Sequence, residues 1–309
     1  MTNNCQNTGT SKGLGRTLTD PLRLAGRPSS PPDDMNTTGY KILFPVDFSS
    51  RSVLAAQHVK MWSEHFSAVL NTLHIVDNPR YGSRAVAWRT ADLELFCQYQ
   101  FGEDAARALV LAGSRADVLE YFVNRERIDL VMLPRNHMSL IDRLFGDSMA
   151  AILLERCSAS VWMTEHLKED QTVTVDHVLC AMHFRQDTML DAQHVRILKT
   201  VRQLALTFGA EVTFLQVTGN AKSDESWSAE GTNVGSQSWL AQAQDILGSP
   251  IRLLRKPGNV ISGIRDTAGQ IEADLVVVGR MRPEAISFGR QGRILKIDHA
   301  VRCPVLSVW

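Results

Sequence analysis

Two patterns of apolar and polar residues alternate along the chain from residue 40 to its end. One is a short apolar run bounded by glycine, proline or polar residues, as at 40–46 and 275–278. Such runs are typical of strands that are buried on both faces of a parallel sheet. The other is a longer segment with apolar residues three and four positions apart, as in 51–66, which predicts an amphipathic helix. Their alternation predicts an α/β fold, a doubly wound parallel sheet with helices on both sides.

The predicted elements follow one another closely. Strands are expected over residues 40–46, 68–76, 107–111, 160–163, 177–182, 211–217, 251–254, 275–278 and 305–308, with one more beginning at Leu130. Helices are expected over 51–66, 88–100, 114–127, 190–208, 239–247 and 293–300, with one more from Ser148 and one ending near Gln270. Ser49 or Ser50 is placed to cap the first helix, and Ser114-x-x-Asp117 resembles a capping box. The polar residues 219–236 predict a loop.

The chain contains an internal repeat. Residues 128–163 match residues 273–308 without a gap at an offset of 145, so that Asp129 pairs with Asp274 and Leu130 with Leu275. A repeat of this length predicts two copies of one domain. We therefore expect domains at 40–166 and 172–309, with a polar linker at 165–174.

Residues 1–39 differ in composition from the rest of the chain. They are rich in Asn, Thr, Ser, Gly and Pro and show no apolar periodicity, which predicts a disordered tail. The tail has no continuous apolar segment of the kind found in secretory signals. Met35 lies just before the first strand, and we expect translation to start there. Mass spectrometry of the native N-terminus tests that hypothesis.

The loop after the strand at 275–278 carries a glycine pattern. Gly279, Arg282, Gly292 and Arg293 fall on the spacing Gly-x2-Gly-x9-Gly-[Ser/Thr]. The stretch resembles the C-terminal half of a universal stress protein domain, whose nucleotide-binding members carry this motif. The resemblance implies two Rossmann-like domains in tandem and ATP as a ligand. The second copy keeps two of the three glycines, but it has His183 where the family's binders have an aspartate.

The first copy keeps a different part of the same pattern. Its motif positions are Pro134, His137, Asp147 and Ser148, so only the terminal serine is retained. Asp47 stands directly after the first strand, where the family resemblance implies an acid near the adenine and ribose. Pro134 has no N–H to offer a phosphate, and the Asp147 carboxylate would occupy the place of one. The first loop is therefore expected to be satisfied without a ligand, and neither copy holds the family's full site.

An arginine cluster accompanies the second loop. Arg280, Arg282, Arg290 and Arg293 lie within fourteen residues of one another. Guanidinium forks suit phosphate and can replace lost backbone donors, which favours an anion site for a nucleotide or another phosphorylated ligand. The alternative is a solvated basic face that pairs with acidic groups of the chain or of a dimer partner. The predicted nucleotide-binding residues are Asp47, Ser148, Gly279, Arg280, Arg282, Gly292 and Arg293.

Composition limits the remaining classes of function. The chain has 33 Lys and Arg against 33 Asp and Glu, so net charge gives no reason to expect nucleic acid or a membrane surface as a partner. No apolar run approaches the roughly 18 residues of a membrane helix. The five cysteines lack CxxC spacing and the histidines lack HxH or HExxH spacing, which predicts structural thiols in a reducing compartment and no metal site. Without a Gly-x-Ser-x-Gly elbow or a complete Walker loop, we expect no catalytic residues and no enzyme activity.

Two functions remain open. One is a cytoplasmic stress-response regulator that senses a nucleotide through the second loop. The other is an interaction module without a small ligand, in which the degenerate loops are structural and an unknown protein is the partner. Because domains of this family often pair through their last strands, residues 160–163 and 305–308 are expected to pair inside the chain. A homodimer of the whole chain stays an alternative.

Overall fold

The computed structural model describes residues 39–77, 82–134, 149–164, 174–183, 190–218, 227–228, 238–280 and 291–309. The predicted tail up to residue 38, the linker residues 165–173 and most of the loop at 219–236 lie outside the described residues. So do two of the predicted site residues, Ser148 and Arg282.

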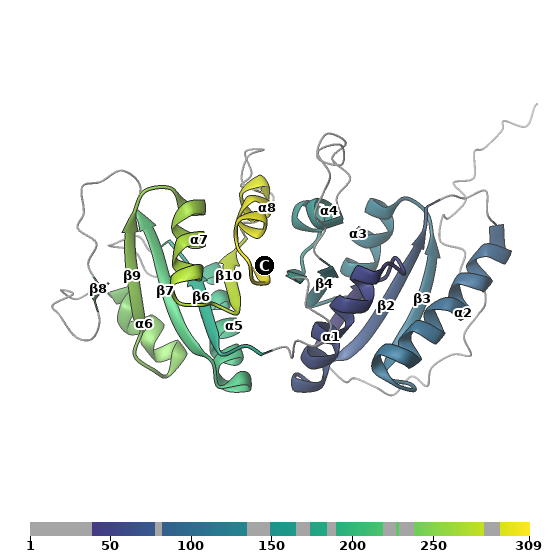
Figure 1. Ribbon diagram of the computed structural model, residues 1–309, viewed down its shortest axis with the longest axis horizontal. Coiled ribbons are helices and arrows are strands. Elements are labelled where there is room, and N and C mark those ends of the chain that lie inside the picture. The colour runs from purple at the N-terminus through teal and green to yellow at the C-terminus, as the bar shows by residue number, and fades with distance from the viewer. Residues whose placement is uncertain are drawn as a thin grey trace, which may run out of the picture.

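The described strands form one sheet of eleven strands, in the order β3-β2-β1-β4-β5-β11-β10-β6-β7-β9-β8 (Figure 1). The elements of the first half are β1 Lys41–Pro45, α1 Ser50–His65, β2 Val69–Val76, α2 Gly82–Phe101, β3 Ala106–Ala112, α3 Arg115–Glu126, β4 Leu130–Pro134, α4 Met149–Arg156 and β5 Ser160–Thr164. The elements of the second half are β6 His177–Ala181, α5 Ala192–Phe208, β7 Glu211–Thr218, β8 Trp227–Ser228, α6 Ser238–Leu247, β9 Arg252–Pro257, α7 Val260–Gln270, β10 Leu275–Gly279, α8 Gln291–Ala300 and β11 Val305–Val308.

Each half is a doubly wound sheet whose strands are parallel, apart from the two-residue β8 in the second half, which confirms the predicted fold class. In the first half β1 pairs in parallel with both β2 and β4, and in the second half β6 pairs in the same way with β7 and β10. Asp129 and Asp274, which the repeat pairs, also act alike. The Asp129 carboxylate accepts from the backbone N–H of Lys41 at 2.8 Å, and the Asp274 carboxylate accepts from that of His177 at 2.9 Å.

Three local predictions need correction. Residues 227–228 form β8, which pairs antiparallel with β9, inside the stretch predicted as a loop. The prediction missed this strand because two residues are too few to show an apolar period. Helix α2 begins at Gly82, six residues before the predicted start at Trp88. Ser114 is the N-cap residue of α3 but its side chain makes no capping hydrogen bond, so the capping box predicted there is wrong.

The two halves are joined through their last strands. β5 and β11 pair antiparallel, with Trp162 opposite Leu306 and Met163 opposite Val305. The predicted pairing of these strands inside the chain is therefore confirmed. It makes the sheet continuous and covers one edge of each half, which would otherwise expose unpaired backbone groups.

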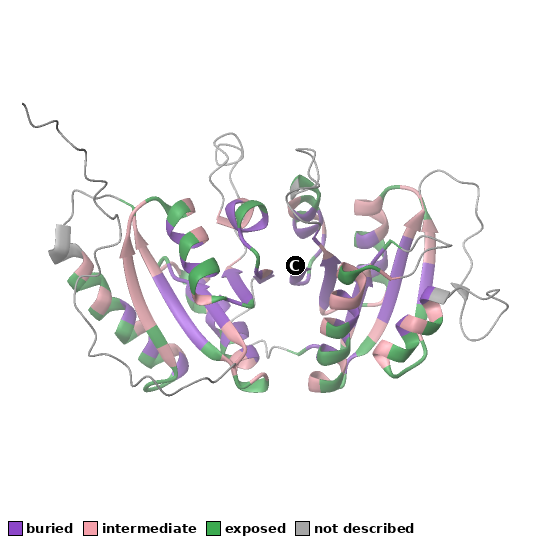
Figure 2. Ribbon diagram, turned by 180° about the vertical axis from the view of Figure 1, so that it is seen from behind, coloured by how far each residue is buried: buried purple, intermediate pink, exposed green. Residues whose placement is uncertain are grey.

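Helices cover both faces of this sheet. Buried residues of α1, α2, α5 and α6 share one hydrophobic cluster, and those of α3, α4, α7 and α8 share another. Buried residues lie mainly in the inner strands, the edge strand β3 is mostly intermediate, and the helices carry many exposed residues (Figure 2). Each cluster takes residues from both halves, so the halves share their two cores.

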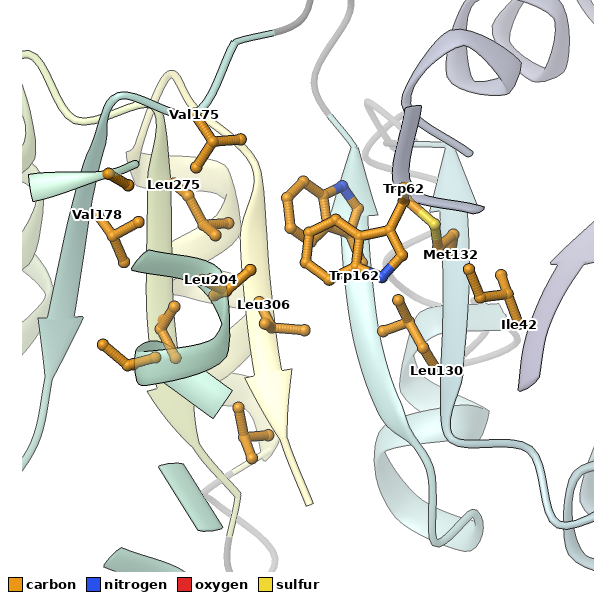
Figure 3. Close-up of a cluster of buried hydrophobic side chains, with 14 of the residues drawn as sticks. Ile42, Trp62, Leu130, Met132, Trp162, Val175, Val178, Leu204, Leu275 and Leu306 are labelled. Atoms are coloured by element: carbon orange, nitrogen blue, oxygen red, sulfur yellow. The ribbon is translucent and has the colours of Figure 1, made fainter. Parts of the chain in front are cut away.

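Aromatic side chains fill the junction on the α1 and α5 face. The rings of Trp62 and Trp162 lie 4.6 Å apart, and Phe208 at the end of α5 lies 5.8 Å from Trp62. Leu204 and Leu306 of the second half face these two tryptophans (Figure 3). Both tryptophans are 2% exposed or less, so their burial depends on the second half being in place.

Candidate functional site

Two points in the sheet are candidates for a ligand site. In open α/β sheets, ligands bind beyond the carboxyl ends of neighbouring strands from which the chain continues in opposite directions. Here those pairs are β1 with β4 and β6 with β10. Asp47 follows β1 in the first half, and Gly279 ends β10 in the second.

Asp47 organises the turn between β1 and α1. Its Oδ1 accepts hydrogen bonds from the Ser49 N–H at 2.9 Å, the Ser49 hydroxyl at 2.5 Å and the Ser52 hydroxyl at 2.6 Å. Burial raises the pKa of Asp47, but these hydrogen bonds and the charge of Arg51 outweigh it and hold the pKa below its usual value. The carboxylate is thus ionised at neutral pH and still exposed to solvent.

Ser49 is the residue that caps α1, as predicted. Its hydroxyl accepts from the N–H of Ser52 at 3.4 Å, which satisfies one of the free donors of the first turn. The cap and the Asp47 hydrogen bonds together fix a tight local network. In this network the aspartate has a structural role at the helix start whether or not a ligand is bound.

Phe48 is an additional side chain at this end of β1 that sequence reasoning did not select. Its backbone is left-handed, with φ 60, a conformation that is uncommon outside glycine. The ring lies 4.7 Å from the imidazole of His74, and the guanidinium of Arg89 lies 5.4 Å from the ring centre. These contacts join the β1–α1 turn to β2 and α2. No local sequence pattern marks the residue, because its contacts are with β2 and α2, which are distant in sequence.

Gly279 is explained by helix packing. A Cβ placed on it would lie 2.5 Å from Cδ1 of Ile197, which is buried on α5. A larger residue here would force the tip of the Ile197 side chain to shift, so glycine suits the close approach of α5 to the end of β10. The motif glycine thus has a structural reason that is independent of any phosphate.

Gly292 and Arg293 lie in the first turn of α8, and both are exposed. A Cβ on Gly292 would meet nothing within 4 Å. The first N–H groups of a helix have no partner within the helix and can hold an anion. These two residues are accordingly available to a ligand at the start of α8.

Arg280 lies elsewhere than predicted. It is 2% exposed, and its guanidinium donates to the carbonyl oxygens of Leu153 at 2.9 Å, Cys157 at 2.8 Å and Ala159 at 2.6 Å. All three belong to the end of α4 and the segment after it, in the first half. The guanidinium also lies 4.5 Å from the ring centre of Trp309. We therefore assign Arg280 to the junction between the halves instead of to a bound phosphate.

The structure does not gather the predicted residues into one site. Asp47 is in the first half, and the other described residues of the set are in the second. Of those, Gly279 and Arg280 are committed to packing and to the junction, while Gly292 and Arg293 are exposed.

Among the described residues, no group of three or more His, Cys, Asp or Glu is arranged to hold a metal ion. None of the described helices is long and apolar enough to cross a membrane.

The buried cysteines are explained by packing. Cys157 and Cys303 are 1% and 7% exposed, within the cluster on the α4 and α8 face, as predicted. Burial raises the pKa of the Cys157 thiol to about 11, although the neighbouring charge of Arg280 opposes that shift. This thiol is therefore protonated and unreactive at neutral pH.

The strand order and the crossover connections define a Rossmann-like α/β protein. Residues 40–165 match the sequence model of the Universal stress protein family, so this segment is a universal stress protein domain. No curated protein matches the sequence.

Solved structures resemble both halves together. A universal stress protein from Archaeoglobus fulgidus covers 87% of this chain and 95% of its own, with TM-score 0.64 and 14% identity. A Pseudomonas aeruginosa protein named only provisionally as a universal stress protein covers 88% of this chain and 93% of its own, with TM-score 0.57 and 13% identity. A functionally unknown protein from the same species reaches TM-score 0.51 at 12% identity, covering 88% of this chain and 92% of its own. At these identities the likeness is one of fold.

Proposed function

We propose that the chain is a tandem universal stress protein-type regulator, whose second half is a second domain of the same kind. It acts in the cytoplasm in the response to stress, and it works by binding and not by turnover. Its small ligand is ATP or another phosphorylated molecule, held where α8 begins in the second half.

The observation that carries this proposal is the exposed first turn of α8. Gly292 leaves its backbone open to close approach, and Arg293 adds a cation beside the first N–H groups of α8, which have no partner within the helix. Arg282, which the motif places in the preceding loop, is proposed as a second arginine for the same phosphate. Asp129 and Asp274 make equivalent hydrogen bonds in the two halves, which supports a second domain of the same kind as the first.

A scaffold without a small ligand is the second candidate, and Arg280 favours it. Arg280 donates to three carbonyls of the other half and so stabilises the junction between the halves. The packing of Ile197 against Gly279 explains the glycine without a ligand. In that case the continuous sheet presents its outer helices to a protein partner. The two candidates differ in whether the start of α8 holds a ligand.

The test is a search for nucleotide in the native protein. The full chain is purified from its own cells and denatured, released small molecules are identified by mass spectrometry, and Mg-ATP, ADP and AMP are titrated calorimetrically. An Arg282→Ala, Arg293→Ala double variant is expected to bind at least tenfold more weakly, since one charge-assisted hydrogen bond is worth about 1.5–3 kcal/mol. Arg265→Ala, an exposed arginine on α7 paired with Asp266, is the matched control. No released ligand and no binding heat at millimolar nucleotide would favour the scaffold.

A further inference from the structure

A hollow of about 330 Å³ lies between the two halves. The first half contributes the end of α1 and residues at the starts of β1, β4 and β5, among them Tyr40, Asp129 and Ser160. The second half contributes one side of α5 and the end of β11. The volume is at the lower end of the range of roughly 300–1,000 Å³ for small-molecule sites. In the first half this is the opposite end of the sheet from Asp47, so the hollow is separate from that switch point.

One part of the wall is aromatic. Trp62 and Phe66 stack with their ring centres 4.6 Å apart, Tyr40 lies 5.8 Å from Phe66, and Trp309 adds a ring from the second half. Burial and the carboxylate of Asp129 raise the pKa of the Tyr40 phenol well above its usual value, so the phenol stays neutral and can donate a hydrogen bond. Aromatic walls of this kind bind planar apolar groups.

Another part of the wall is cationic. Arg196 and Lys199 are three residues apart on α5, so both side chains reach the hollow from one side of the helix. The Nη2 of Arg196 donates to Oε1 of Gln193 at 3.1 Å. Its Nε is buried and has no hydrogen-bond partner among the described residues. A buried N–H without an acceptor costs about 1–3 kcal/mol, so an acceptor oxygen from outside the described residues is expected to meet it.

Three other polar groups in the wall already have hydrogen-bond partners. The Asp129 carboxylate accepts from the N–H of Lys41, and the Ser160 hydroxyl accepts from the N–H of Trp309 at 3.3 Å. The Ser158 hydroxyl donates to Asn124 at 3.0 Å. The side chains in the wall thus carry two cations against one carboxylate, and that carboxylate is tied to the start of β1.

We propose that this hollow is a binding site for a small molecule that has a flat apolar ring system and one carboxylate or phosphate group. The anion is held by Arg196 and Lys199, and the ring system packs against Trp62, Phe66 and Trp309. Because the walls come from both halves, the bound molecule stabilises their junction. This site shares no residue with the proposed nucleotide site at α8, and either can be present without the other.

Three naphthalene probes test the site on the full chain. 1-Naphthoate and 1-naphthyl phosphate are titrated by calorimetry, and tryptophan fluorescence is followed because Trp62 and Trp309 line the hollow. We expect one saturable site per chain for at least one of the two anions, and the comparison shows which anion is preferred. Neutral 1-naphthalenemethanol is expected to bind at least tenfold more weakly. No saturable binding of either anion up to millimolar concentration would overturn the proposal.

Variants on α5 locate the site. Arg196→Gln with Lys199→Gln is expected to weaken the preferred anion at least tenfold and to leave the neutral probe unchanged. Thr200→Trp, which fills the hollow from the same helix, is expected to abolish binding of all three probes. Arg202→Gln is the control, because Arg202 is an exposed arginine of α5 outside the wall. Thermal melts confirm that each variant is folded, and equal affinity in the double variant and the unaltered protein would contradict the proposal.

Discussion

His58 is a buried histidine on α1, 3% exposed, whose ring centre lies 6.3 Å from that of Trp162. Burial lowers its pKa from 6.5 to about 4. The unfolded chain therefore takes up a proton below pH 6.5 that the folded chain accepts only near pH 4. The contribution of His58 to the free energy of unfolding is fully present above pH 6.5. It is lost as the pH drops from 6.5 to 4, which lowers the free energy of unfolding by about 3 kcal/mol.

His58→Leu is expected to remove that part of the acid sensitivity. Urea unfolding at pH 7 and at pH 4.5 measures the loss of stability, which should be smaller by about 2–3 kcal/mol in the variant. His299→Leu, at an exposed histidine of α8, is the control and should keep the full loss. His74, whose pKa burial also lowers, leaves a residual dependence in both variants. Equal losses in His58→Leu and the unaltered protein would contradict the assignment.

The two motif glycines are expected to respond oppositely to alanine. Gly279→Ala forces a Cβ against Ile197 and should destabilise the fold by about 1–3 kcal/mol, whereas Gly292→Ala should be neutral or stabilise α8 by up to about 1 kcal/mol. Chemical denaturation measures both. Ile197→Val removes the crowded Cδ1, so the pair Gly279→Ala, Ile197→Val should be more stable than the sum of its single effects. Additive effects would show that the two residues do not clash.

At the scale of the element, Arg280 holds the end of α4. The last carbonyls of a helix have no partner within the helix, and a basic side chain near them is favourable. Burial lowers the pKa of Arg280 to about 10, so the guanidinium remains charged at neutral pH. The residue comes from the end of β10, and the helix that it stabilises therefore depends on the other half.

Arg280→Met should lower the free energy of unfolding by about 3 kcal/mol or more, because three carbonyls lose a charged donor. Arg280→Lys should recover only part of this, since an ammonium cannot reproduce the planar fork. Arg293→Met, at an exposed arginine, should change stability by no more than about 0.5 kcal/mol. Urea unfolding measures all three variants. Equal unfolding midpoints for Arg280→Met and Arg293→Met would contradict the stabilising role of Arg280 at the junction.

At the scale of the whole molecule, the antiparallel β5–β11 pair makes two halves into one unit. Leu306 is 1% exposed and lies opposite Trp162 in this pair. Leu306→Lys places a charge in the shared core, and we expect the halves to unfold in two steps instead of one. Leu206→Lys is the control, because Leu206 is 74% exposed on α5. Circular dichroism and tryptophan fluorescence should give coincident transitions for the control and separate ones for the junction variant.

The sequence alone determined the fold class, the position of most elements and the repeat. Buried parallel strands appear as short apolar runs, and amphipathic helices appear as apolar residues three and four positions apart. Both patterns are local, so they can be recognised in the sequence. The cap at Ser49 was predictable for the same reason. At Ser114 and at β8 local pattern was insufficient, since a cap depends on side-chain orientation and a two-residue strand on its neighbour β9.

Only the tertiary structure decided what the motif residues do. The sequence placed Arg280 in a basic cluster, but the β5–β11 pairing carries its guanidinium to carbonyls more than one hundred and twenty residues away. Gly279 is crowded by Ile197, which is 82 residues away in sequence. The hollow is lined by residues of both halves, which are also distant in sequence. Hydrophobic periodicity records which side of an element is buried. What lies against that side depends on contacts between distant segments, which no local pattern contains.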